Sequence, residues 1–323
     1  MPIVDMPREA LFAYKGLNPR PADMDEFWDR SVAEMEALGT AYTLEEAAFQ
    51  TPQVGCWHLY FTGVNGARIH SKFLRPRTVS APMPALLVFH GYPGKSPDYA
   101  QLLAHAQAGF IVAAMDCRGQ AGLSEDVGGV KGNTQHGQII RGLEERRPEK
   151  LLYRDIFLDT AQLARILMAM PEVDAGRVGA MGGSQGGGLT LACAALTPTL
   201  NRIAPTFPFL CDYKRVWEMD LDVDAYAELR SYSRSFDPRH EREDEIFTLL
   251  GYIDNQHLAH RIRTEVMMFT GLIDTICPPS TQFAAYNKIT SPKQVVFYPD
   301  FGHEYLPEAD DLALTFLMGM QSR

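Results

Sequence analysis

From residue 84 onward, short, mostly apolar runs alternate with segments of helical character, and this alternation limits the possible folds more than any other feature of the sequence. Such runs are typical of strands that are buried on both faces of a parallel sheet. The predicted strands lie at 85–89, 110–115, 177–181, 203–207, 264–270 and 294–298. The predicted helices lie at 99–109, 154–170, 188–196, 280–289 and 307–321. This order predicts an α/β fold with a doubly wound, mostly parallel sheet.

The first part of the chain follows a different pattern. Residues 1–50 predict an N-terminal helical extension, because the apolar residues from Phe27 to Leu38 recur at roughly helical spacing. Residues 55–61 and 68–74 are strand-like and flank Asn65-Gly66, a strong signal for an antiparallel hairpin. We therefore expect the hairpin to precede the parallel part of the sheet.

Residues 211–260 interrupt the alternation of strands and helices. They mix charged and aromatic residues without a clear strand, so they predict a helical insertion within one α/β domain that spans 1–323. Such an insertion either covers a site at the carboxyl ends of the strands or is a surface excursion without a role in the chemistry. The sequence alone supports both interpretations equally.

Composition narrows the possible partners and cofactors. The net charge of −10 argues against nucleic acid and anionic membrane surfaces as partners, and no apolar run is long enough to span a bilayer. The five cysteines are scattered and form no C-x-x-C pair, and the nine histidines form no H-E-x-x-H motif, so we expect neither a metal nor another cofactor. Since Met1 to Gly16 lacks the apolar segment of a secretory signal, we expect a cytoplasmic protein.

A glycine-crowded turn joins the predicted strand 177–181 to the predicted helix 188–196. Its residues Gly182-Gly183-Ser184-Gln185-Gly186 fit the G-x-S-x-G nucleophile elbow, in which a strained turn exposes the serine hydroxyl. Small residues beside the serine let strand and helix approach closely, and the helix N-terminus favours a developing oxyanion. The motif alone is short enough to occur by chance, so its significance depends on partners for Ser184.

Partners for the serine appear further along the chain, each just after a predicted strand. Asp274 follows the strand 264–270, and His303 follows the strand 294–298. Ser184, Asp274 and His303 thus occur in the order Ser…Asp…His of the α/β-hydrolase fold, which predicts a catalytic triad of nucleophile, acid and base. Asp300 is an alternative acid, but we prefer Asp274 because it ends a strand of its own.

Two other polar residues after predicted strands need a role. Asp116 precedes Ser184 and would violate the chain order, so we expect it to cap a turn or to pair with Arg118. His90, which follows the strand 85–89, is expected to be a structural histidine that bonds a neighbouring turn.

An oxyanion hole requires two N–H donors near the serine. Gln185 is the residue after the nucleophile, and Tyr92 lies in the loop after the strand 85–89, so their backbone N–H groups are the predicted donors. The side chains of Tyr92 and Pro208 are predicted to wall a small acyl pocket.

Several motifs together resemble the acetyl xylan esterase and cephalosporin C deacetylase group, carbohydrate esterase family 7. The strongest matches are Arg118-Gly119-Gln120, residues 182–187 and His303-Glu304. The supporting matches are Asp25-Glu26-Phe27-Trp28-Asp29, His90-Gly91-Tyr92, Tyr153-Arg154, Pro208-Phe209-Leu210 and Cys277-Pro278-Pro279-Ser280-Thr281. The resemblance runs from about Tyr14 to the end of the chain. It implies the same triad, Ser184, Asp274 and His303, and the same oxyanion donors, Tyr92 and Gln185, that were predicted above from the position of each residue in the sequence.

The resemblance also implies a function. Members of this family remove acetyl groups from xylo-oligosaccharides and cephalosporin C without a metal, and are cytoplasmic homohexamers whose shared interior admits small substrates. Two departures from the family pattern leave the preferred substrate open: Pro93 replaces a polar residue, and Ala225 replaces the proline of a Pro-Tyr pair. The alternatives are a peptidase or dienelactone-type hydrolase on the same fold, and a non-catalytic binding module, which would not need all three triad residues.

Overall fold

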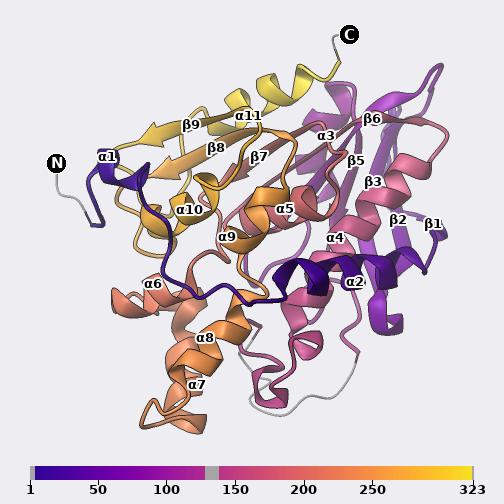
Figure 1. The fold of residues 1–323 in the computed structure, drawn as a ribbon. Helices are drawn as coiled ribbons and strands as arrows, with labels where there is room; N and C mark the ends of the chain where they lie inside the picture. The colour runs from indigo at the N-terminus through magenta and orange to yellow at the C-terminus, as the bar shows by residue number, and fades with distance from the viewer. Residues whose placement is uncertain (1–3, 128–137, 322–323) are drawn as a thin grey trace.

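A nine-stranded sheet forms the centre of the protein in the computed structural model, which describes residues 4–127 and 138–321 (Figure 1). The strand order is β1-β2-β3-β5-β4-β6-β7-β8-β9, in which β1, β2, β3 and β5 pair antiparallel and the strands from β5 to β9 pair parallel. The strands are β1 (Tyr42–Glu46), β2 (Val54–Thr62), β3 (Arg68–Pro76), β4 (Met83–Phe89), β5 (Ile111–Met115), β6 (Val173–Gly183), β7 (Arg202–Thr206), β8 (Glu265–Gly271) and β9 (Lys293–Tyr298). The predicted α/β fold with a mostly parallel sheet is confirmed.

Helices cover both faces of this sheet. The α-helices of the described residues are α1 (Arg8–Leu11), α2 (Met24–Glu36), α3 (Tyr99–Gln107), α4 (Leu152–Ala169), α5 (Gln185–Leu196), α6 (Tyr213–Glu218), α7 (Ala227–Phe236), α8 (Glu243–Gly251), α9 (Asn255–Leu258), α10 (Pro279–Tyr286) and α11 (Ala309–Met318). Helices α3 and α11 lie on one face, and α2, α4 and α5 lie on the other (Figure 1).

The central strands are apolar along their whole length because both of their faces are buried. In β4, Leu87 and Phe89 point into the core beneath α4 and α5, whereas Leu86 and Val88 point into the core beneath α3 and α11. Successive side chains of a strand alternate between the faces of the sheet, so one continuous apolar run supplies two cores.

The N-terminal region contains more than the predicted helices. Helix α2 occupies the predicted helical stretch, and β2 pairs with β3 as the predicted antiparallel hairpin. Asn65 in the connecting turn has a φ of 59°, a left-handed conformation that asparagine tolerates well. Residues 42–46 form the edge strand β1, however, so the purely helical interpretation of 1–50 missed a strand.

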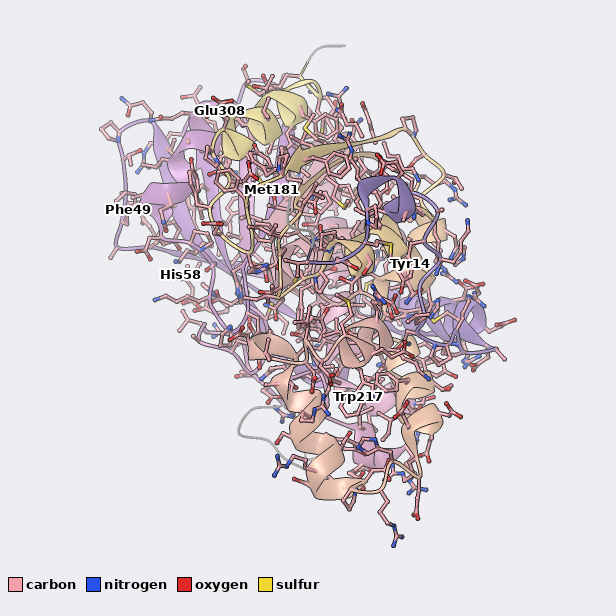
Figure 2. The ribbon with its side chains drawn as sticks, turned by 90° about the vertical axis from the view of Figure 1, so that its left-hand side faces the viewer. Tyr14, Phe49, His58, Met181, Trp217 and Glu308 are labelled. Carbon is pink, nitrogen blue, oxygen red and sulfur yellow. The ribbon has the colours of Figure 1, made fainter. Side chains whose placement is uncertain are left out.

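The segment 211–260 is helical, as expected from its sequence. It contains α6, α7, α8, α9 and short 3₁₀ turns, and it connects the neighbouring strands β7 and β8. Helices α6, α7 and α8 project from one side of the molecule (Figure 1). Figure 2 places Trp217 of α6 in this projection, at the opposite end from Glu308, which directly precedes α11.

Candidate active site

Ser184 lies on the sharp turn between β6 and α5. Its φ of 57° and ψ of −119° are unusual for a residue with a side chain, as expected of a nucleophile elbow. Glycine is required on both sides of the turn, since a Cβ on Gly182 would lie 2.5 Å, and one on Gly186 only 2.1 Å, from the carbonyl oxygen of Phe89. The glycines therefore permit the close approach of strand and helix that presents the Ser184 side chain.

His303 joins the predicted serine to the predicted acid. Its Nε2 lies 2.9 Å from Ser184 Oγ, and its Nδ1 lies 2.8 Å from Asp274 Oδ2. Asp300, the alternative acid, is exposed at the surface. The structure thus brings Ser184, His303 and Asp274 together in one hydrogen-bonded chain, with Asp274 rather than Asp300 on the imidazole.

The orientation of Asp274 is fixed on both of its oxygens. Its carboxylate is fully buried, and Oδ1 accepts hydrogen bonds from the backbone N–H groups of Ile276 and Cys277, at 2.9 and 2.8 Å. This leaves Oδ2 for His303. A carboxylate at Nδ1 favours the tautomer with the proton on that nitrogen, so Nε2 is free to accept the proton of the Ser184 hydroxyl. The ring of Phe207 packs against the imidazole at a centroid distance of 4.4 Å.

Gln185, one of the two predicted oxyanion donors, is the first residue of α5. Its N–H is therefore one of the groups that an α-helix leaves without an intrahelical partner. Its side chain is fully buried and pairs with the amide of Gln120 in both directions, at 2.6 and 3.0 Å. The hydroxyl of Tyr153 also donates to Gln185 Oε1 at 2.7 Å. Sequence analysis missed this cluster, although Gln120 and Tyr153 both stood in the motifs of the family resemblance.

Tyr92, the other predicted donor, lies in the loop after β4. Its ring is half-buried and approaches that of Phe209, at a centroid distance of 6.3 Å. Its hydroxyl donates to Glu228 Oε1 at 3.0 Å. The loop 90–94, here called the oxyanion loop because it carries this predicted donor, therefore contacts the helical insertion, a link that no sequence signal indicated.

The two residues of the predicted acyl pocket occupy different environments. Pro208 is buried beside the first turn of α5, where a Cβ on Gly187 would lie 3.0 Å from its Cα. Tyr92 is partly exposed, and Pro93 next to it is exposed. Ala225 is partly buried in the insertion and packs against the main core. An acyl pocket between Tyr92 and Pro208 remains a prediction.

His90 is a structural histidine, as expected. Its Nε2 accepts the N–H of Cys117 at 3.0 Å, and its Nδ1 donates to the carbonyl of Gly91 at 2.9 Å. Burial lowers the pKa of His90, which favours this neutral form. The side chain links the oxyanion loop to the end of β5.

Asp116 caps a turn as expected, but its partner is not Arg118. Its carboxylate accepts the N–H groups of Ser96 and Leu123, at 2.7 and 2.9 Å. Its Oδ2 also lies 2.6 Å from Nδ1 of His70, whose Nε2 in turn lies 2.8 Å from Nδ1 of His58. These hydrogen bonds, led by that from His70, hold the pKa of Asp116 well below its usual value despite burial, which opposes the shift.

Arg118 instead forms a buried ion pair with helix α4. Its Nε and one terminal nitrogen contact Asp159 at 2.6 and 2.7 Å, and the other terminal nitrogen lies 3.3 Å from Asp155. Of the two roles expected for Asp116, the turn cap is confirmed, whereas the pair with Arg118 does not form because Asp116 points toward β3 and Arg118 toward α4.

Residues 4–127 and 138–321 offer neither a cluster of metal ligands nor a membrane-spanning helix. Within these ranges, no group of three or more histidine, cysteine, aspartate or glutamate side chains is arranged to hold a metal ion. No helix of the same ranges is both long and apolar enough to cross a bilayer. All five cysteines are buried as free thiols.

The strained serine turn after β6, with aspartate and histidine after β8 and β9, places the protein in the α/β-hydrolase class. A model of the acetyl xylan esterase family matches residues 1–320. The chain therefore belongs to the acetyl xylan esterase family, a family of carboxylic ester hydrolases, as its motifs predicted.

Two solved structures of this family are very similar to the chain. Acetyl xylan esterase 1 from Thermoanaerobacterium sp. JW/SL YS485 is 54% identical, with a TM-score of 0.96 over 98% of this chain and 100% of its own. Acetyl xylan esterase from Paenibacillus sp. R4 is 32% identical, with a TM-score of 0.92 over 97% of this chain and 99% of its own.

More distant relatives are less similar to the chain in sequence, and they cover it or are covered by it only in part. Acetyl esterase Axe7A of Xylanibacter ruminicola is 24% identical over 291 residues, which cover 88% of this chain but only 64% of that relative's length. An acylaminoacyl peptidase of Pyrococcus horikoshii is 15% identical, with a TM-score of 0.55 over 83% of this chain and 40% of its own, so it shares the fold alone.

Proposed function

We propose that the protein is a serine esterase that removes acetyl groups from acetylated xylo-oligosaccharides and from small acetyl esters such as cephalosporin C. The observation that carries this proposal is the hydrogen-bonded chain from Asp274 through His303 to Ser184, in a member of the acetyl xylan esterase family. A serine hydroxyl is a poor nucleophile until a neighbouring base takes its proton, and His303 is in hydrogen-bond contact with it.

Acylation would begin with attack of Ser184 Oγ on the acetyl carbonyl carbon while His303 Nε2 takes the hydroxyl proton. Asp274 would stabilise the imidazolium and hold its orientation. The N–H groups of Gln185 and Tyr92 would bind the oxyanion of the tetrahedral intermediate. Collapse of this intermediate breaks the bond to the alcohol oxygen, which leaves with the proton from His303.

Deacylation would repeat the same steps with water. The water oxygen bonds the acyl carbon while His303 takes one of its protons, the bond between Ser184 Oγ and the acyl carbon then breaks, and Oγ receives that proton from His303 as acetic acid leaves. Each step conserves charge and requires no metal or other cofactor, which agrees with the chemistry of a Ser-His-Asp site.

We further propose that a small acyl pocket between Tyr92 and Pro208 restricts the enzyme to short acyl chains. A peptidase or dienelactone-type hydrolase is the alternative on this fold. The strongly similar structures, which are acetyl xylan esterases, favour the ester, whereas the peptidase neighbours share the fold alone. Cleavage of a peptide amide by the pure protein would revive the alternative.

The test is hydrolysis of p-nitrophenyl acetate, butyrate and octanoate by the wild type and by Ser184→Ala, with acetylated xylo-oligosaccharide and cephalosporin C as further substrates. The expected result is a strong preference for acetate, release of acetic acid from the sugar and the antibiotic, and loss of activity in Ser184→Ala. Ser235→Ala, at an exposed position of α7, is the matched control. Activity that survives in Ser184→Ala would refute the site, and equal turnover of acetate and octanoate would refute the deacetylase.

We also propose, from the family resemblance, that the enzyme acts in the cytoplasm as a homohexamer on small substrates. Light scattering on the eluted peak of a size-exclusion column tests the subunit number, and a monomeric or dimeric mass would contradict it.

A further inference from the structure

Glu228 is a buried carboxylate of the helical insertion that contacts the loop of a predicted oxyanion donor. It lies in the first turn of α7 and is only 6% exposed. Its Oε1 accepts the hydroxyl of Tyr92 at 3.0 Å. Its Oε2 accepts the backbone N–H groups of Ile139 and Ile140, at 2.7 and 3.1 Å. One side chain thus joins the insertion, the oxyanion loop and the segment before α4.

The hydrogen-bond partners of Glu228 in the described part of the chain are uncharged. No ion pair links it to a cation among the described residues, so its partners are neutral donors. Burial, the main cause, raises the pKa of Glu228 to about 7, although the hydrogen bonds from Ile140, Tyr92 and Ile139 oppose this shift. The negative charge of Glu228 adds to the rise in pKa of three tyrosines, Tyr92 in the oxyanion loop, Tyr153 in α4 and Tyr213 in α6. Burial raises the pKa of all three, so they stay neutral around pH 7.

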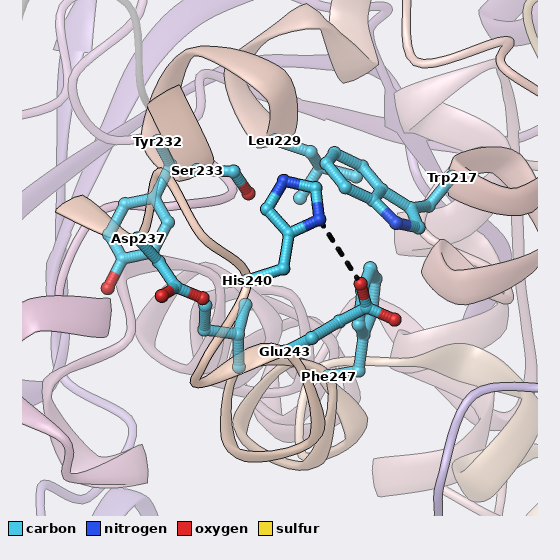
Figure 3. Close-up of a pocket in the computed structure, with 9 residues that line it drawn as sticks. Trp217, Leu229, Tyr232, Ser233, Asp237, His240, Glu243 and Phe247 are labelled. Carbon is cyan, nitrogen blue, oxygen red and sulfur yellow. Dashed lines mark ion pairs between the residues drawn. The ribbon is translucent and has the colours of Figure 1, made fainter. Parts of the chain in front are cut away.

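The helix that carries Glu228 packs against the other helices of the insertion. Leu229 and Tyr232 of α7 face Trp217 of α6 and Phe247 of α8 around a small cavity (Figure 3). The cavity measures about 10 Å³, which is roughly the minimum space for one water molecule, so it is a packing gap rather than a substrate site. The carboxylate of Glu228 therefore reaches Tyr92 from a helix that packs within the insertion.

We propose that Glu228 is a positioning residue of the acyl-transfer site, which fixes Tyr92 and with it the backbone donor of the oxyanion loop. This inference rests on the proposed esterase function. It gives the insertion a role in the chemistry, one of the two interpretations that its sequence left open. The hydrogen bond from the Tyr92 hydroxyl restrains the residue whose N–H is the predicted donor, so loss of the carboxylate would let that donor shift away from the oxyanion.

The test compares Glu228→Gln, Tyr92→Phe and the double variant with wild type on p-nitrophenyl acetate. We expect each single variant to lower kcat by about tenfold to a hundredfold with KM within about threefold, as a small misplacement of a catalytic group does. Since both substitutions break the same hydrogen bond between Glu228 and Tyr92, the double variant should lose no more kcat than the more impaired single variant. Asp222→Asn is the matched control, because Asp222 is a buried insertion carboxylate that pairs with Arg230.

A second measurement distinguishes positioning from simple structural support. The acid limb of kcat/KM should be steeper in wild type than in Glu228→Gln, because burial raises the pKa of Glu228 to about 7 and its protonation weakens the hold on Tyr92. Multiplicative losses in the double variant, an unchanged acid limb, or an equal kcat loss in Asp222→Asn would overturn the proposal. If Glu228→Gln does not fold, Tyr92→Phe alone decides, and an unchanged kcat overturns it. The esterase function itself fails separately, through activity that persists in Ser184→Ala.

Discussion

Two buried aspartate–histidine pairs follow parallel strands of the same sheet, and they differ mainly in what lies beyond the histidine. Asp274 follows β8 and bonds His303 at 2.8 Å, and Asp116 follows β5 and bonds His70 at 2.6 Å. Both aspartates also accept two backbone N–H groups, and neither is more than 2% exposed. The aspartate–histidine pair alone therefore does not define a catalytic site.

The two pairs differ in the third side chain, the one that the histidine contacts. His303 Nε2 meets the hydroxyl of Ser184, which stands on a strained turn, whereas His70 Nε2 meets the imidazole of His58. Moreover, His303 lies in a loop beyond β9, whereas His70 lies within β3, where it is 1% exposed. The first arrangement can pass a proton to and from a substrate, and the second has no nucleophile and serves to hold the loop at Asp116.

The largest expected contrast between the two pairs is in catalysis. Asp274→Asn should lower kcat about ten-thousandfold, because an amide at this position favours the tautomer of His303 that cannot accept the serine proton. Asp116→Asn should leave kcat within about threefold but lower the free energy of unfolding by about 1–3 kcal/mol, since the Ser96 and Leu123 N–H groups lose a charged acceptor. Hydrolysis of p-nitrophenyl acetate and urea unfolding measure the two effects. Equal kcat losses in both variants would remove the distinction between the pairs.

A second contrast concerns stability in acid. The folded state holds the pKa of Asp116 well below its unfolded value of about 3.9, so this carboxylate stabilises the fold above that pH and ceases to do so as the pH falls toward the folded-state pKa. We therefore expect wild type to lose more stability than Asp116→Asn between pH 6 and pH 3. Thermal melts across this range measure it, and parallel curves for the two proteins would contradict the role of Asp116.

The smallest expected effect is at His58, the last side chain of the hydrogen-bonded series Asp116–His70–His58. His58→Ala removes the hydrogen bond to His70 at a partly exposed position, so the free energy of unfolding should fall by about 0.5–1.5 kcal/mol with kcat unchanged. Urea unfolding and a kinetic assay of the same preparation measure both. A large loss of kcat would instead mean that the pair at β5 takes part in the reaction.

This comparison also shows what the sequence could reveal. Ser184, Asp274 and His303 could be brought together because each directly follows a strand of the parallel sheet, and such strands end at one edge. His70 could not be found in this way, because it lies within β3, whose antiparallel pairing with β5 leaves no local signal. The fold was predictable from the buried strands, whereas β1, with one face partly exposed and only five residues, was not.

The contacts behind the site were the least predictable part. Gln120 and Tyr153 stood in the recognised motifs, but only the structure shows that both bond the side chain of Gln185. Likewise, the charged and aromatic composition of 211–260 gave no indication that Glu228 reaches Tyr92. Contacts between distant segments depend on how helices pack on the sheet, which local spacing does not encode.

The backbone of Ser184 has a consequence for protein engineering. A non-glycine residue with a φ of 57° and a ψ of −119° costs about 1–3 kcal/mol, and glycine would adopt this conformation without strain. About 0.4–1 kcal/mol of this gain in stability is lost again, because glycine increases the conformational entropy of the unfolded state. Directed evolution that selects for thermal stability alone would therefore favour Ser184→Gly, a variant that is more stable but inactive. Every round of such a selection needs an activity assay as well.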